Sequence, residues 1–125
     1  MPNSSRGRVC VGTAVLLAIT WGLSSDTPGL GAPAVINLTA KEWRYEPGEV
    51  SSSAGEITFE VNNGGLIEHN FVVVDAARQK RAEIPYIEPG ETLRATANLQ
   101  PGVYTIYCGL PGHRDAGMVA TLRVR

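Results

Sequence analysis

The stretch from Tyr107 to Met118, YCGLPGHRDAGM, carries a cysteine, a histidine and a methionine at the spacing C-x4-H-x4-M. Cys108 ends a short apolar run, which predicts that its sulfur lies at the end of a β-strand. The glycines and the proline that follow predict a tight loop returning His113 to the same point, and Met118 opens the next apolar run. A second histidine, His69, lies far upstream in the segment IEHN. The pattern indicates one site built from two distant parts of the chain.

The four side chains are one thiolate, two imidazoles and one thioether. This is the donor set of a type 1 copper site, in which two histidines and one cysteine form a trigonal plane and a methionine makes a weak, long axial bond. The chain has only two histidines, and both stand in the expected positions. We therefore predict one copper ion, bound by His69, Cys108, His113 and Met118.

The cysteine content favours the same interpretation. The chain has two cysteines, and the other one, Cys10, lies near the N-terminus. Cys108 is thus expected to have no disulfide partner within its own domain. A lone thiol in an oxidising compartment is reactive unless something such as a metal occupies it.

Other uses of these residues stay open at this stage. Zinc would accept one cysteine and two histidines, but it prefers a fourth strong ligand or water to a thioether. A Cys-His nucleophile would also need an orienting residue and an oxyanion hole. A binuclear copper centre would need a second cysteine four residues after Cys108, where the chain has Gly112, and multicopper enzymes need additional histidines. A buried structural cysteine with unrelated histidines is the remaining alternative.

Length and charge limit the possible functions. The chain of 125 residues has room for one domain, and its 11 basic and 12 acidic residues give a formal net charge of −1. The basic residues are scattered rather than clustered, so we expect no nucleic-acid partner.

The first 34 residues have the features of a secretory signal peptide. Arg6 and Arg8 precede the apolar run 9–23, and Ala32-Pro33-Ala34 is an A-x-A cleavage signal. We predict a signal peptide over 1–34, cleavage after Ala34, and a domain over 35–125 located in the periplasm or outside the cell. Retention of the segment as a membrane anchor is the alternative.

Hydrophobic alternation predicts an all-β domain. Runs with period two or with continuous apolar character occur at 35–39, 56–61, 71–74, 92–99, 103–108 and 119–124, separated by turn signals such as Pro47-Gly48 and Pro89-Gly90. About seven to eight short strands at this spacing are typical of a Greek-key β-sandwich or barrel. The polar segment 75–84 predicts a surface loop or a short helix. Trp43 and Tyr45 alternate on an early predicted strand, and both are expected to pack in the core.

The motif YCGLPGHRDAGM, together with the upstream EHN, resembles the cupredoxin family, which includes plastocyanin, azurin and auracyanin. The resemblance covers the chain from EWRYEPGEV to the last strand. It implies that His69, Cys108 and His113 are equatorial copper ligands and that Met118 is the axial one. It also implies that Asn70 forms a hydrogen bond to the cysteine loop and so supports the thiolate. The Cys-to-His spacing is like that of azurin, whereas the His-to-Met spacing is like that of plastocyanin.

We therefore expect an electron carrier that catalyses no bond chemistry of its own. The expected partners are a redox donor and a redox acceptor that bind transiently to a monomer, at an apolar patch formed by Leu66, Leu110 and Pro111. A copper carrier or storage protein is the alternative function. Such carriers usually offer exposed sites rich in methionine or histidine, whereas this chain has one methionine besides the first residue.

Overall fold

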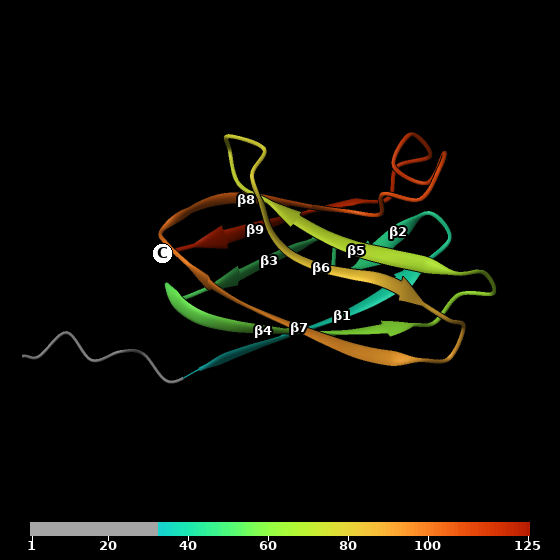
Figure 1. Cartoon of the computed structure of the whole chain (residues 1–125), viewed down its shortest axis with the longest axis horizontal. Helices are drawn as coiled ribbons and strands as arrows, with labels where there is room; N and C mark the ends of the chain where they lie inside the picture. Colours follow the sequence, from blue (N-terminus) through green and yellow to red (C-terminus); the bar gives the residue numbers. More distant parts are fainter. Residues whose placement is uncertain (1–32) are drawn as a thin grey trace, which may run out of the picture.

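The structure is a computed structural model and describes residues 33–125. This part of the chain forms two β-sheets packed face to face, with no helix (Figure 1). The first sheet has the order β2 (Arg44–Glu46), β1 (Ala34–Lys41), β4 (Gly55–Asn63), β7 (Thr92–Leu99). The second has the order β3 (Glu49–Ser52), β9 (Val119–Val124), β8 (Gly102–Tyr107), β5 (His69–Val74), β6 (Lys80–Ile87).

The predicted all-β sandwich is confirmed. Residues 33–125 contain nine strands rather than seven or eight, because the short β2 and β3 form separate strands in different sheets. Both sheets are mixed: β1 runs parallel to β4, and β3 runs parallel to β9, while the other pairs are antiparallel.

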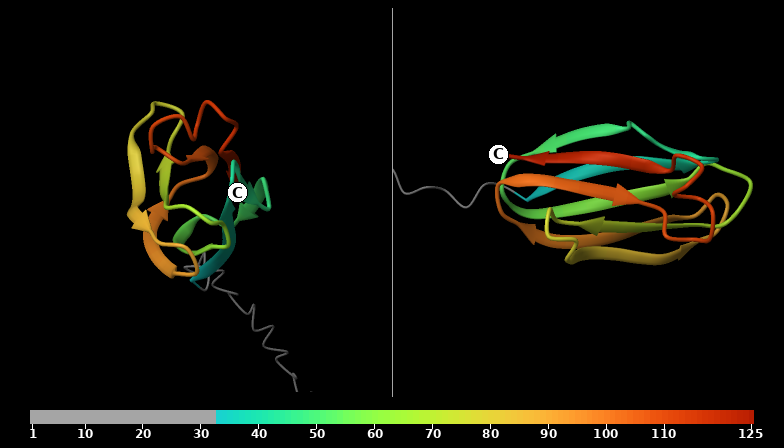
Figure 2. Two further views of the ribbon diagram at one scale, coloured as in Figure 1. Left: turned by 90° about the vertical axis from the view of Figure 1, so that its right-hand side faces the viewer. Right: turned by 90° about the horizontal axis from the view of Figure 1, so that it is seen from above.

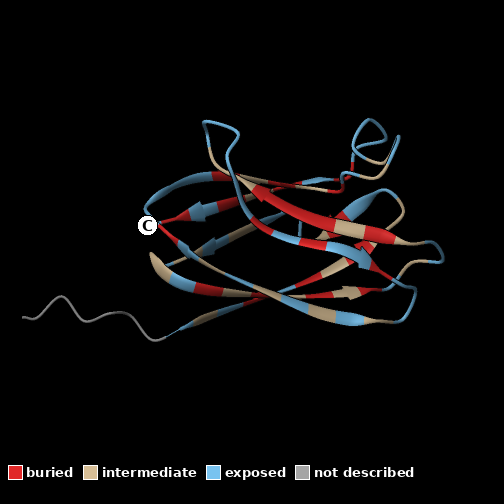
Figure 3. Ribbon diagram, in the orientation of Figure 1, coloured by how far each residue is buried: buried red, intermediate tan, exposed pale blue. Residues whose placement is uncertain are grey.

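The core lies between the sheets and follows the predicted alternation. In β4 the side chains of Ile57, Phe59 and Val61 are fully buried, and the residues between them are not (Figure 3). Phe59 packs against Phe71 of the opposite sheet, with ring centroids 5.2 Å apart. This central contact joins the strand that leads towards His69 to the strand that begins with it.

The segment 75–84 differs from the prediction. The carboxylate of Asp75 accepts hydrogen bonds from the backbone N–H groups of Ala77 and Gln79, both at 2.9 Å, and this closes a turn. The chain then enters β6 at Lys80. This strand is polar because it lies at the edge of its sheet with one face in water, where Arg81 donates to Asp75 at 2.6 Å.

Parallel pairing of β1 and β4 brings their C-terminal ends to the same end of the sandwich. Ala40 pairs with Asn63, so the turn after β1 and the loop after β4 are neighbours. The loop 108–118 lies at this end too, opposite the C-terminus of the chain (Figures 1 and 2). We call this end the loop pole.

The predicted signal peptide falls on residues that are almost all outside the described range, so it stays a prediction; Ala34 is the first residue of β1. Among residues 33–125 no helix has the length and apolar character needed to cross a membrane.

Candidate metal centre

Three of the four predicted ligand side chains meet at the loop pole. The Nδ1 atoms of His69 and His113 are 3.3 Å apart, and Cys108 Sγ is 3.4 Å from His113 Nδ1. His69 and Cys108 are fully buried, whereas His113 is half-buried. The three donor atoms all lie within 4.8 Å of one another.

The chemistry of this cluster fits a metal ion. Two imidazole lone pairs that face each other repel unless a proton or a cation lies between them, and a thiolate beside them adds a soft, negatively charged donor. Burial lowers the pKa of His69, and the neighbouring His113 lowers it further, so this imidazole is neutral near pH 7. A neutral imidazole is the form that binds a metal.

The loop 108–118 is held in shape by its own backbone. Cys108 N–H donates to the carbonyl of Met118, and Met118 N–H donates to the carbonyl of His113, both at 3.1 Å. Gly112, with a φ of 79°, makes the left-handed turn directly before His113. Met118 itself is fully buried next to β9. The loop thus fixes Cys108, His113 and Met118 relative to one another.

Asn70 connects β5 to the cysteine loop. Its Oδ1 accepts a hydrogen bond from Gly109 N–H at 2.6 Å, and its backbone N–H points at Cys108 Sγ at 3.4 Å. The carbonyl of Asn70 accepts a hydrogen bond from the Tyr45 hydroxyl at 2.5 Å. Burial raises the pKa of Tyr45, so this hydroxyl stays protonated and remains a donor.

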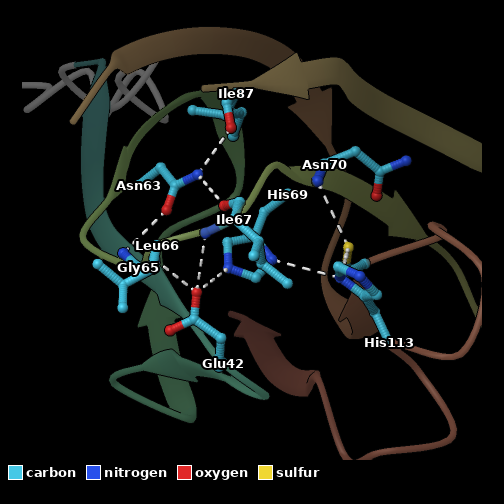
Figure 4. A network of polar contacts seen from close by, with 10 residues as sticks. Glu42, Asn63, Gly65, Leu66, Ile67, His69, Asn70, Ile87 and His113 are labelled. Atoms are coloured by element: carbon cyan, nitrogen blue, oxygen red, sulfur yellow. Dashed lines mark hydrogen bonds and ion pairs between the residues drawn. The ribbon is translucent and has the colours of Figure 1, made fainter. Parts of the chain in front are cut away.

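A second network shapes the loop that leads to His69 (Figure 4). The buried Asn63 donates from Nδ2 to the carbonyls of Ile67 and Ile87, at 2.8 and 2.7 Å, and accepts from Gly65 N–H at 2.9 Å. Glu42 Oε1 accepts from the N–H groups of Leu66 and Ile67, at 2.6 and 3.2 Å. These bonds fix the path of the chain into β5.

Glu42 is also close to His69. Its Oε1 lies 3.5 Å from His69 Nε2, the ring nitrogen that faces away from Cys108 and His113. The hydrogen bond from Leu66 N–H holds the pKa of the Glu42 carboxyl below its ordinary value, so the group is ionised at neutral pH. Sequence analysis missed Glu42, because it stands 27 positions before His69 and comes close to it through the pairing of β1 with β4. It also missed the role of Asn63, whose side chain bonds to Ile67 and Gly65 in its own loop and to Ile87 of β6.

The prediction for Trp43 was wrong. Tyr45 is buried in the core, but the Trp43 side chain is 43% exposed. The two residues are not on one strand, because β1 ends at Lys41 and the turn that follows breaks the alternation. Trp43 instead meets the ring of His113 edge to face, with centroids 4.8 Å apart.

The three residues predicted for partner docking are all at the loop pole. Leu66 is 89% exposed and Pro111 is exposed, whereas Leu110 is half-buried against the core. Together with Trp43 they place apolar surface in the loops next to the half-buried His113.

Comparison with known proteins identifies the family to which the chain belongs. The sequence matches the cupredoxin-like domain family over residues 13–120. It is 32% identical over 100 residues to the copper-resistant cuproprotein CopI of Rubrivivax gelatinosus, and the alignment covers 66% of this chain and 60% of that protein. The chain therefore matches less than two thirds of that relative's length.

Solved structures with the same fold include two auracyanins. The auracyanin of Roseiflexus castenholzii has a TM-score of 0.68 and 23% identity, over 76% of this chain and 99% of the other. Auracyanin A of Chloroflexus aurantiacus has a TM-score of 0.67 and 22% identity, over 75% and 100%. The azurin Az-iso2 of Methylomonas sp. strain J has a TM-score of 0.65 and 20% identity, over 74% and 98%. At these identities the likeness concerns the fold.

The fold, the family match and the His-Cys-His cluster agree with one another. Cupredoxins bind copper, and the donor atoms at the loop pole are of the kind that copper requires. The chain belongs to the cupredoxin family.

Proposed function

We propose that the protein carries single electrons between redox partners outside the cytoplasm, with one type 1 copper ion bound by His69, Cys108, His113 and Met118. The observation that carries the proposal is the convergence of Cys108 Sγ with the Nδ1 atoms of both histidines, in a cluster of which only His113 is partly exposed. The bound copper would supply a one-electron couple. No bond-making chemistry is proposed, and the location outside the cytoplasm rests on the predicted signal peptide.

The chain's own residues would do three things in this function. Backbone hydrogen bonds within the loop 108–118, and the bond from Gly109 to Asn70 of β5, hold the thiol and the imidazoles in place. This keeps the structural change small when the charge of the site changes. Burial of His69, Cys108 and Met118 excludes water from the site. The half-buried His113 gives the cluster its route to the surface, where an electron would enter and leave.

The first experiment is to add Cu(II) to the full chain and record visible absorption and EPR spectra. An intense thiolate-to-copper band with a narrow copper hyperfine splitting is expected for the proposed site. A pale, weakly absorbing protein would contradict the proposed ligand set.

A copper carrier or storage protein is the second candidate, and the similarity to a protein named as copper-resistant favours it. Two measurements on the copper-loaded protein separate the candidates. Reversible one-electron reduction with slow copper loss to a chelator supports electron transfer. Rapid copper loss without reversible reduction supports a carrier.

Changing Met118 to glutamine is expected to lower the reduction potential by more than about 59 mV, which is a tenfold change in the relative affinity for Cu(II) and Cu(I). The reason is that a harder amide oxygen stabilises Cu(II) more than a thioether does. Met118→Leu, which removes the axial donor, is the matched variant and should raise the potential. Redox titration measures both, and a raised or unchanged potential in Met118→Gln would contradict the axial role.

Changing Leu66 to glutamate is expected to slow electron self-exchange about tenfold, because like charges then meet when two copies approach at the loop pole. Leu66 is the cleanest test of the docking patch, since its side chain is 89% exposed. Val103→Glu is the control: Val103 is also exposed, but it lies near the start of β8, at the opposite end of the strand from Cys108. NMR line broadening in mixtures of the two redox states measures the rate, and equal rates in the two variants would argue against this patch.

A further inference from the structure

The ring nitrogen Nε2 of His69 is the one buried side-chain nitrogen or oxygen atom within residues 33–125 that lacks a hydrogen-bond partner. The ring of His69 is fully buried, and its other nitrogen, Nδ1, faces His113. A buried polar atom without a partner is unfavourable, so its surroundings need an explanation. The carboxylate oxygen Oε1 of Glu42 lies 3.5 Å from it (Figure 4).

The structure holds this oxygen in place from several sides. Oε1 accepts two backbone hydrogen bonds, from Leu66 and Ile67, on the loop that enters β5 at His69. Gly65 is next to it, and a Cβ atom at this position would overlap Oε1. The carboxylate can approach so closely because position 65 has no side chain. The loop that contains Gly65 and the Glu42 carboxylate therefore pack closely together beside the Nε2 atom of His69.

We propose that Glu42 is a positioning residue for the metal centre: its carboxylate selects the His69 form that carries its proton on Nε2, which leaves the Nδ1 lone pair free for copper. At 3.5 Å the attraction is that of a fixed negative charge for an N–H group, rather than that of a short hydrogen bond. The hydrogen-bond partner of one imidazole nitrogen sets which nitrogen is available to a metal. The same charge favours Cu(II) over Cu(I), because Cu(II) carries more positive charge.

The inference rests on the proposed function in one respect, the assignment of His69 as a copper ligand. The simpler rival is that Glu42 only anchors the loop through Leu66 and Ile67. Glu42→Gln separates the two, because the amide keeps an oxygen for the loop and removes the charge. Glu46→Gln is the matched control: Glu46 is on the neighbouring strand β2 and its contacts are with Lys41 and Arg44 rather than with His69.

The first readout needs no copper. In the metal-free full chain, nitrogen NMR that correlates the ring nitrogens with the ring protons identifies which nitrogen of His69 carries the proton. The Nε2–H form is expected to dominate in the wild type and in Glu46→Gln, and its share is expected to fall in Glu42→Gln; an unchanged share in Glu42→Gln would show that Glu42 does not select this form. A dominant Nδ1–H form in the wild type would overturn the proposal.

The second readout is the reduction potential of the copper-loaded variants. Glu42→Gln is expected to weaken Cu(II) relative to Cu(I) about tenfold, a rise of about 59 mV, whereas Glu46→Gln should change the ratio less than about twofold. Equal shifts in the two variants, or no shift in Glu42→Gln, would overturn the proposal in favour of a loop anchor. If no copper-thiolate band forms in the wild type, the proposed function fails, and the NMR result alone then decides whether Glu42 orients His69.

Discussion

Changing Cys108 to serine is expected to abolish the intense visible absorption of the copper-loaded protein and to weaken copper binding at least about 100-fold. The band arises from the thiolate, and a serine hydroxyl is a harder donor that does not ionise near neutral pH. Loss of an outer hydrogen-bond partner alone typically costs about 10–100-fold in metal affinity, so loss of a ligand should cost at least as much. Absorption spectra and competition with a copper chelator measure the two effects.

Cys10→Ser is the natural control for this experiment, because Cys10 is the other cysteine of the chain and lies outside the proposed domain. It should leave the spectrum and the copper affinity unchanged. Serine is close to cysteine in size, so circular dichroism is expected to show the same β-structure in all three proteins. An intense blue band that persists in Cys108→Ser, or disappears in Cys10→Ser, would contradict the proposed ligand set.

Changing Phe59 to alanine is expected to lower the free energy of unfolding by about 3–5 kcal/mol. Phe59 is fully buried on β4, between β1 and β7, and its ring packs against Phe71. Its removal leaves a cavity where the two sheets meet. The loss is large for a domain whose total stability is expected to be about 5–15 kcal/mol. Denaturant titration of the copper-free protein measures it without the added stability that a bound metal gives.

Thr58→Ala is the matched variant, because Thr58 is the preceding residue on the same strand and its hydroxyl pairs with Thr96 on the outer face, at 3.0 Å. Its cost should stay below about 1 kcal/mol. If Phe59→Ala does not fold, Phe59→Leu still tests the core, with a smaller expected cost of about 1–2 kcal/mol. Costs for the Phe59 variants no larger than that of Thr58→Ala would show that the core does not depend on this ring.

Strand positions were predictable where side chains alternate strictly. The runs 92–99 and 119–124 coincide with β7 and β9, and Ile57, Phe59 and Val61 face inwards as expected. Segment 75–84 was not predicted to contain a strand, because its first residues form a turn and only two positions of β6 within it, Ala82 and Ile84, face the core. Two apolar positions are too few to reveal a period of two. The prediction for Trp43 was wrong because a spacing of two residues implies a shared face only while the strand continues.

The sequence by itself determined the donor types and their spacing in the loop after β8, because cysteine, histidine and methionine at C-x4-H-x4-M are local information. It also determined that the domain is all-β, because alternation is a property of neighbouring residues. Only the tertiary structure decided which atoms face one another: His69 Nδ1 against His113, Glu42 against His69 Nε2, and Trp43 against the His113 ring. These contacts depend on strand pairings between residues far apart in the chain, above all the parallel register of β1 and β4. Such pairings are set by the burial of the whole core, and no local pattern of residues encodes them.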